Sequence, residues 1–91
     1  MSKTYKVEFS KRAAKALSKM DPPTKQLIVS WVEQRLEGCD NPRRYGKGLE
    51  GDLSSAWSYR VGDYRVIADI ADDKILIYVL DIGHRRKIYK R

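Results

Sequence analysis

Three segments of the chain have the hydrophobic pattern of β-strands. Over residues 5–9, "YKVEF", every second residue is apolar, which predicts a half-buried strand. Residues 56–69, "AWSYRVGDYRVIAD", contain two runs rich in aromatic and β-branched residues on either side of Gly62-Asp63, which predicts a hairpin with a two-residue turn. Residues 74–83, "KILIYVLDIG", are apolar on both faces, which predicts a central strand covered on both sides.

Between the first strand and the hairpin, the pattern changes to that of helices. Ser10 is a predicted N-cap, and the apolar residues after it have helical spacing: Ala13, Ala16, Leu17 and Met20. The residues "DPP" at 21–23 end this helix and begin a second one, which has its own apolar stripe and Gly38 as its C-terminal cap. Residues 39–56 read as a loop. We therefore expect a single α+β domain over residues 1–91, with a small, mainly antiparallel sheet in the order β-α-α-β-β-β and a helical hairpin packed on one face.

Composition narrows the class of protein. The chain has 91 residues and a formal net charge of +7, which favours polyanionic partners. Its longest apolar run, "ILIYVL", is far shorter than the roughly 20 residues that span a membrane. Cys39 is the only cysteine, so no internal disulfide can form, and no metal-ligand motif accompanies it. We expect a soluble, cytoplasmic protein that needs no metal or other cofactor.

The hairpin pairs two arginines. A two-residue loop at Gly62-Asp63 sets Arg60 opposite Arg65, with the side chains roughly 5 Å apart on one face. Alternation puts Trp57, Tyr59 and Val61 under the helices and the arginines on the other face. The guanidinium groups repel unless an anion such as a phosphate lies between them. Alternatively, each arginine pairs with an acid such as Asp69 or lies in water.

The C-terminal residues "GHRRKIYKR" contain five Lys or Arg and no acid, and they follow directly from the last strand. Together with the hairpin they provide the groups that metal-free RNA cleavage requires: Arg60, Arg65, His84, Arg85 and Tyr89. Arginines can stabilise the negatively charged phosphorane, and histidine or tyrosine can transfer protons to and from the ribose oxygens. A basic terminus can also be simply solvated.

These residues resemble the RelE/ParE superfamily of toxins, and the RelE branch in particular. The likeness extends through "YKVEFSKRAAKAL", "NPRRYGKGLEGDLSSAW", "YRVGDYRVIADI" and "IGHRRKIY". It implies a ribosome-dependent endoribonuclease that cleaves mRNA in the ribosomal A site and is held inactive by a RelB-like antitoxin. It also implies a small antiparallel sheet backed by two helices.

The resemblance implies roles for individual residues. Arg65 and Arg85 are expected on the scissile phosphate, Tyr89 is expected to stack on the substrate or exchange protons with it, and Arg60 is expected to bind or support the transition state. Ser58 departs from the pattern, because many relatives have a basic residue there. We hypothesise that His84 compensates for it.

The remaining cations are predicted RNA-binding residues: Arg43, Arg44, Lys47, Arg86, Lys87 and Lys90. The three in the loop could equally be solvated or contact an acidic antitoxin. Two other functions remain open. A ParE-like toxin would block DNA gyrase by binding, without nuclease activity, and a plain RNA-binding module would not be toxic.

Overall fold

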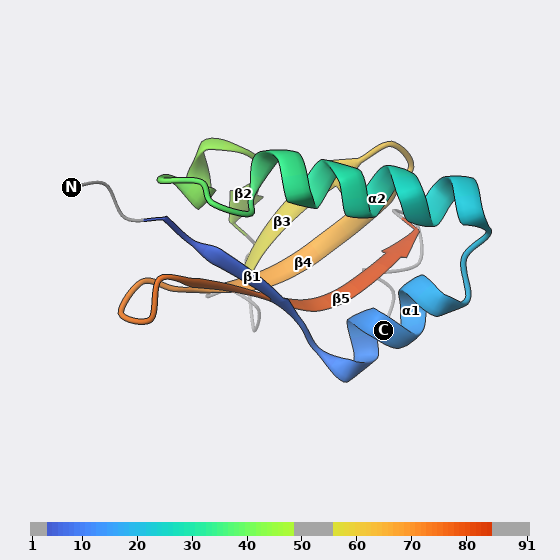
Figure 1. Ribbon diagram of the computed structural model, residues 1–91, viewed down its shortest axis with the longest axis horizontal. Coiled ribbons are helices and arrows are strands. Elements are labelled where there is room, and N and C mark those ends of the chain that lie inside the picture. Colours follow the sequence, from blue (N-terminus) through green and yellow to red (C-terminus); the bar gives the residue numbers. More distant parts are fainter. Residues whose placement is uncertain (1–3, 49–55, 85–91) are drawn as a thin grey trace.

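The computed structural model describes residues 4–48 and 56–84, which form two α-helices and a five-stranded sheet (Figure 1). The elements in chain order are β1 (Lys6–Phe9), α1 (Lys11–Ser18), α2 (Pro22–Arg35), the 3₁₀ helix η1 (Pro42–Arg44), β2 (Lys47–Gly48), β3 (Ala56–Val61), β4 (Tyr64–Ala71) and β5 (Leu76–His84). The predicted α+β class and the predicted order are confirmed. The short elements η1 and β2 lie in the segment that was predicted to be loop, since two or three residues are too few to show a period.

The sheet has the strand order β1-β5-β4-β3-β2. Neighbouring strands from β2 to β5 are antiparallel, as predicted, and β1 pairs with β5 in parallel. The N-terminal strand therefore joins the sheet beside the C-terminal one, and β5 becomes an interior strand (Figure 1).

Local sequence explains both helix starts. The Ser10 side chain accepts a hydrogen bond from the Ala13 amide at 3.0 Å and donates one to the Leu80 carbonyl at 2.8 Å, so the cap of α1 is also tied to β5. Helix α2 begins after Asp21 with Pro22 in its first turn, where a missing amide proton costs nothing. Neither of these two described helices is long and apolar enough to cross a membrane.

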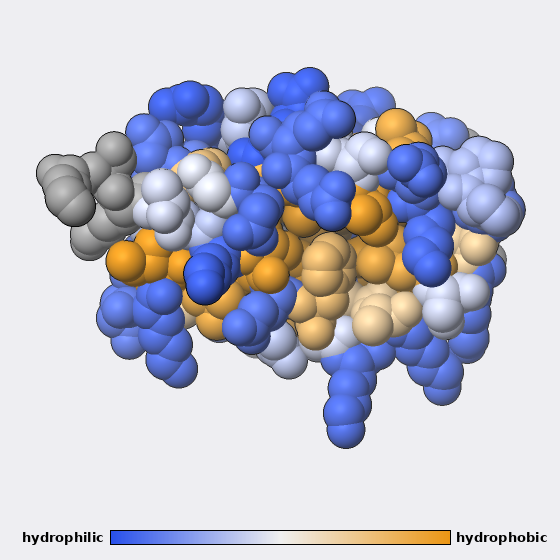
Figure 2. Space-filling view, viewed as in Figure 1, coloured by the Kyte–Doolittle hydropathy of each residue, from blue (hydrophilic) through white to orange (hydrophobic). Residues whose placement is uncertain are grey.

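A single core joins both helices to one face of the sheet. Its largest fully buried apolar side chains include Tyr59 of β3, Ile28 of α2 and Ile77 of β5. Figure 2 shows that an apolar band crosses this side of the molecule beneath α2, bordered by hydrophilic side chains. The helices therefore cover the face that the alternation in β3 and β4 predicted.

The expectation that β5 is covered on both sides is wrong. Its register against β4 shifts where Ile67 pairs with Asp81 and Ala68 pairs with Val79, which leaves Leu80 as an extra residue. This bulge allows Ile77, Val79 and Ile82 all to be buried, although simple alternation would turn one of them outward. Tyr78 points away from this core and is 36% exposed. The run reads as apolar on both faces because the bulge reverses its alternation.

Candidate functional site

The hairpin sets two arginines side by side. Arg60 and Arg65 are directly opposed in the β3–β4 register, and Val61 opposite Tyr64 closes the predicted two-residue turn. Gly62 has a φ of +61°, the positive value that the first position of such a turn requires. Since paired residues share a face, both guanidinium groups project from the side opposite the helices.

The two arginines border an open hollow of about 360 Å³. The described residues that line it come from the end of the loop, β2, β3 and β4: Gly46, Lys47, Ser58, Arg60 and Arg65. Arg65 is half-buried, and its Nη1 donates to the Ser58 hydroxyl at 3.4 Å. Lys47 and Arg60 are exposed, whereas Ser58 is buried. The hollow is thus a cationic pocket open to solvent.

Among the residues that the structure describes, no acid lines this hollow. Within residues 4–48 and 56–84, neither Lys47 nor Arg60 forms an ion pair. Asp81 lies on the same face of the sheet, but its carboxylate pairs with Arg12 at 3.3 Å. Asp69, the acid that the sequence suggested as a partner, forms no ion pair among the described residues. Three positive charges therefore converge where an anion is the natural ligand.

A glycine brings Lys47 to the hollow. Gly46 has a φ of +75°, and a Cβ at this position would collide with the carbonyl oxygen of Ser58. Only glycine allows the chain to approach β3 so closely. β2 then begins, with Lys47 opposite Ser58 and Gly48 opposite Trp57.

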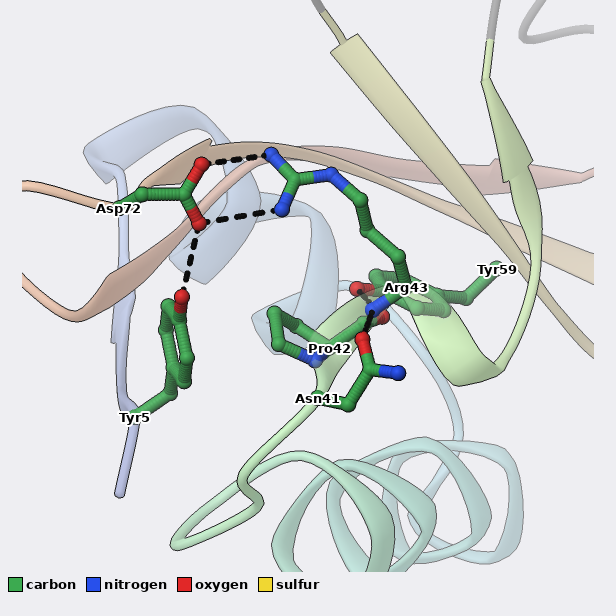
Figure 3. Close-up of polar contacts among 6 residues, drawn as sticks. All are labelled: Tyr5, Asn41, Pro42, Arg43, Tyr59 and Asp72. Atoms are coloured by element: carbon green, nitrogen blue, oxygen red, sulfur yellow. Dashed lines mark hydrogen bonds and ion pairs between the residues drawn. The ribbon is translucent and has the colours of Figure 1, made fainter. Parts of the chain in front are cut away.

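Hydrogen bonds from β3 fix the loop that leads to β2. The buried Tyr59 hydroxyl donates to the Pro42 carbonyl at 2.7 Å (Figure 3), and Trp57 Nε1 donates to the Tyr45 carbonyl at 2.6 Å. Burial raises the pKa of Tyr59 well above its ordinary value, so the phenol stays protonated and remains a donor. The loop is therefore anchored on the helix-covered face while Lys47 reaches the other.

Arg43 and Arg44, predicted to bind RNA, are both engaged in ion pairs. Arg43 forms a bidentate pair with Asp72 (Figure 3), and Arg44 pairs with Asp40 at 3.6 Å. The hydrogen bond to Asp72 raises the pKa of Arg43. The Arg43 guanidinium also lies 5.9 Å from the ring centroid of Trp57, on the helix-covered side. The structure does not bring Arg43 into the hollow.

His84 lies at the end of β5, opposite Tyr64, with the ring centroids 5.6 Å apart. Because Tyr64 packs against the core, the register puts His84 on the helix-covered side rather than beside the arginines. Arg65 is paired instead with Gly83, which has no side chain to fill the adjacent space. The other C-terminal predictions lie outside the described residues: Arg85, Arg86, Lys87, Tyr89 and Lys90.

Sequence reasoning missed Gly46 and treated Ser58 only as a departure from a pattern. The available signal was "YGKG", in which glycines flank a single lysine, as they do where two backbones approach closely. Within the described part of the chain, no group of three or more His, Cys, Asp or Glu side chains is placed to hold a metal ion.

Comparison with known proteins places the chain in a family. The model of the ParE toxin of the parDE type II toxin–antitoxin system matches residues 7–89. Two Mycobacterium tuberculosis proteins are similar to this chain. Toxin RelG is 32% identical over 96% of this chain and 98% of its own length. Toxin RelE is 33% identical over 94% of this chain and 87% of its own length. The crystal structure of the RelBE2 toxin–antitoxin complex from the same organism superposes with a TM-score of 0.82 at 30% identity, covering 90% of this chain and 92% of the matched one. The chain belongs to the RelE/ParE superfamily, the toxins of type II toxin–antitoxin systems.

Proposed function

We propose that this toxin is an endoribonuclease that cleaves mRNA in the ribosomal A site. The observation that supports this best is the directly opposed pair Arg60 and Arg65 at a hollow whose described lining contains no acid. Two guanidinium groups side by side destabilise the sheet by some tenths of a kcal/mol. A phosphate between them reverses the sign of that interaction, and the planar guanidinium suits phosphate oxygens.

The proposed reaction needs no metal. A ribose 2′-hydroxyl loses its proton, and its oxygen forms a bond to the adjacent phosphorus. The bond from phosphorus to the 5′ oxygen breaks, and that oxygen takes up a proton. The products are a 2′,3′-cyclic phosphate and a free 5′-hydroxyl. Fixed cations accelerate this step because negative charge increases on the phosphorane.

The proposed roles are those that the resemblance to RelE toxins implies, and each suits the chemistry of its side chain. Arg65 and Arg85 bind the scissile phosphate, and Arg60 stabilises the transition state. Tyr89 is the proposed partner in proton exchange, and Arg85 follows Gly83, the strand partner of Arg65, by two residues. The sequence suggested His84 as a proton carrier, but the strand register places it on the face opposite Arg60 and Arg65, so the scheme gives it no step. Unchanged single-turnover cleavage is therefore expected in a His84→Gln variant.

The relatives support both the RelE-like activity and an antitoxin partner. The similar mycobacterial proteins are named RelG and RelE, and the superposed structure is that of a toxin bound in a toxin–antitoxin complex. We infer that a RelB-like antitoxin inhibits this chain in the cytoplasm. Its inhibitory segment is expected to present acidic groups to the cationic hollow or to displace residues around Tyr89. A complex that leaves both regions unchanged would contradict this inference.

Primer extension on an mRNA bound to translating ribosomes tests the nuclease directly. The wild type is expected to produce new 5′ ends within the A-site codon, and Arg65→Ala and Arg85→Ala are expected to lose at least about tenfold in rate, as removal of one transition-state donor commonly does. Lys25→Ala removes an exposed positive charge on α2 and is the matched control. Wild-type toxin that leaves the transcript intact would refute the proposal.

The match to the ParE model favours a second candidate. A ParE-like toxin inhibits DNA gyrase by binding and breaks no RNA bond. Induction of the toxin in cells separates the two, because a nuclease first produces cleaved transcripts and a gyrase inhibitor first produces a DNA-damage response.

A further inference from the structure

We propose that Lys47 is a third phosphate-contacting cation of this site, supplied by β2 from outside the hairpin. The proposal deepens the nuclease function and rests on it. Lys47 lines the same hollow as Arg60 and Arg65, although the sequence assigned it only to a general RNA-binding loop.

The register fixes where the lysine points. Lys47 is the direct partner of Ser58 in the antiparallel β2–β3 pair, so both side chains project from the face that bears the arginines. The Ser58 hydroxyl in turn accepts a hydrogen bond from Arg65. Ser58 thus adjoins both a lysine on one neighbouring strand and an arginine on the other. A phosphate held by the arginines lies within reach of the Lys47 ammonium group, which stands on a flexible four-carbon stem.

Lys47 also differs from the other cations of its loop. Arg43 and Arg44 are held by acids, whereas Lys47 forms no ion pair within the described ranges and is exposed. Its charge is therefore available to a ligand without the loss of an existing contact. The arginines of the same loop must first release a carboxylate.

The backbone that holds Lys47 is fixed in advance. Gly46 lies against the Ser58 carbonyl, and the side chains of Trp57 and Tyr59 hold the preceding loop by hydrogen bonds to its carbonyl groups. Because these contacts already hold the backbone, only the side chain of Lys47 has to become ordered when a ligand binds. Such support is what a phosphate-positioning residue needs, because effective catalysis depends on groups held in place before substrate binds.

Moving the lysine across the strand pair gives a sharp test. Lys47→Ala is expected to slow single-turnover cleavage on ribosomes at least tenfold. The double variant Lys47→Ala/Ser58→Lys returns an ammonium group to the same hollow from β3 and is expected to recover to within about threefold of the wild type, since directly paired side chains lie roughly 5 Å apart. Lys25→Ala is expected to cleave like the wild type. Wild-type cleavage by Lys47→Ala would overturn the proposal.

Titration with inorganic phosphate, followed by amide chemical shifts, tests the site without requiring cleavage. We expect shifts at residues 46, 47, 58, 60 and 65 in the wild type, and at least fivefold weaker phosphate binding in Lys47→Ala. Equal phosphate affinity of the two proteins would overturn the role of Lys47, even if the wild type cleaves RNA. Lys47-dependent phosphate binding by a toxin that cleaves no RNA would uphold the site and reject the nuclease. If the double variant fails to fold, the titration decides alone.

Discussion

Arg43 and Asp72 meet in a bidentate ion pair, with Nη1–Oδ1 and Nη2–Oδ2 distances of 3.0 Å. The Tyr5 hydroxyl donates to the same Oδ1 at 2.7 Å, and this hydrogen bond raises the pKa of Tyr5 (Figure 3). The three residues come from η1, from the turn between β4 and β5, and from the segment before β1. The cluster thus links the segment before β1 and the β4–β5 turn to the loop that leads to Lys47.

Loss of the Asp72 charge is expected to loosen that loop at a small cost in stability. Asp72→Asn removes one partner of an exposed ion pair, and exposed pairs contribute at most about 1 kcal/mol. Urea denaturation is expected to show a free energy of unfolding lower by no more than that amount. Asp73→Asn, in the same turn, is the matched control and is expected to unfold like the wild type. A loss several times larger would show that the cluster holds more of the fold than its exposure indicates.

Alanine substitutions at two glycines with positive φ distinguish the cost of backbone strain from the cost of a steric collision. Gly46→Ala must accept both a φ of +75° and a collision with the Ser58 carbonyl, whereas Gly38→Ala, with a φ of +80°, meets nothing within 4 Å. The strain alone costs roughly 1–2 kcal/mol. Thermal unfolding is therefore expected to show a clearly larger loss for Gly46→Ala than for Gly38→Ala, and lower RNA cleavage for Gly46→Ala only. Equal losses would mean that β2 can move away from β3 without consequence.

Tyr59 is expected to lower the free energy of unfolding at alkaline pH. Because burial raises its pKa in the folded state, the unfolded chain ionises first as the pH rises. The contribution of Tyr59 is complete below a pH of about 10, the unfolded pKa, and decreases above it. Urea denaturation from pH 8 to 11 is expected to show a shallower alkaline decline for Tyr59→Phe than for the wild type.

At neutral pH the same variant is expected to be less stable by about 1–2 kcal/mol, because the buried Pro42 carbonyl loses its donor. Tyr78→Phe alters an exposed tyrosine and is the control. Parallel pH curves for Tyr59→Phe and the wild type would show that Tyr59 does not control the alkaline decline.

The features that follow from local chemistry could be predicted from the sequence. The Ser10 cap, the Gly62 turn and the opposition of Arg60 to Arg65 each depend on residues close together in the chain. The two faces of the hairpin then follow from alternation, and so does the placement of the arginines away from the helices.

The features of the fold and of the site that could not be predicted from the sequence depend on contacts between distant segments. Nothing near Arg43 in the sequence indicates that its partner is Asp72, 29 residues away. The coverage of β5 was predicted from a run that reads as apolar on both faces, and it reads so because the bulge at Leu80 reverses the alternation within the strand. Lys47 joined the site only because Gly46 packs against Ser58, which is a tertiary contact. His84 was grouped with the arginines by proximity in the chain, but the strand register places it on the opposite face.

Because Arg60 and Arg65 repel each other, we expect that removing one of them raises the free energy of unfolding but lowers activity. Arg60→Thr removes a like-charge pair, so it is expected to raise the free energy of unfolding by a few tenths of a kcal/mol in chloride at low ionic strength. Phosphate at equal ionic strength is expected to stabilise the wild type more than Arg60→Thr, because only the wild type retains both guanidinium groups for the anion. The same variant is expected to cleave RNA at least tenfold more slowly. Arg12→Thr, which removes an exposed arginine that pairs with Asp81, is the control and is expected to gain no stability. A less stable Arg60→Thr protein with full activity would show that this arginine serves the fold rather than a phosphate.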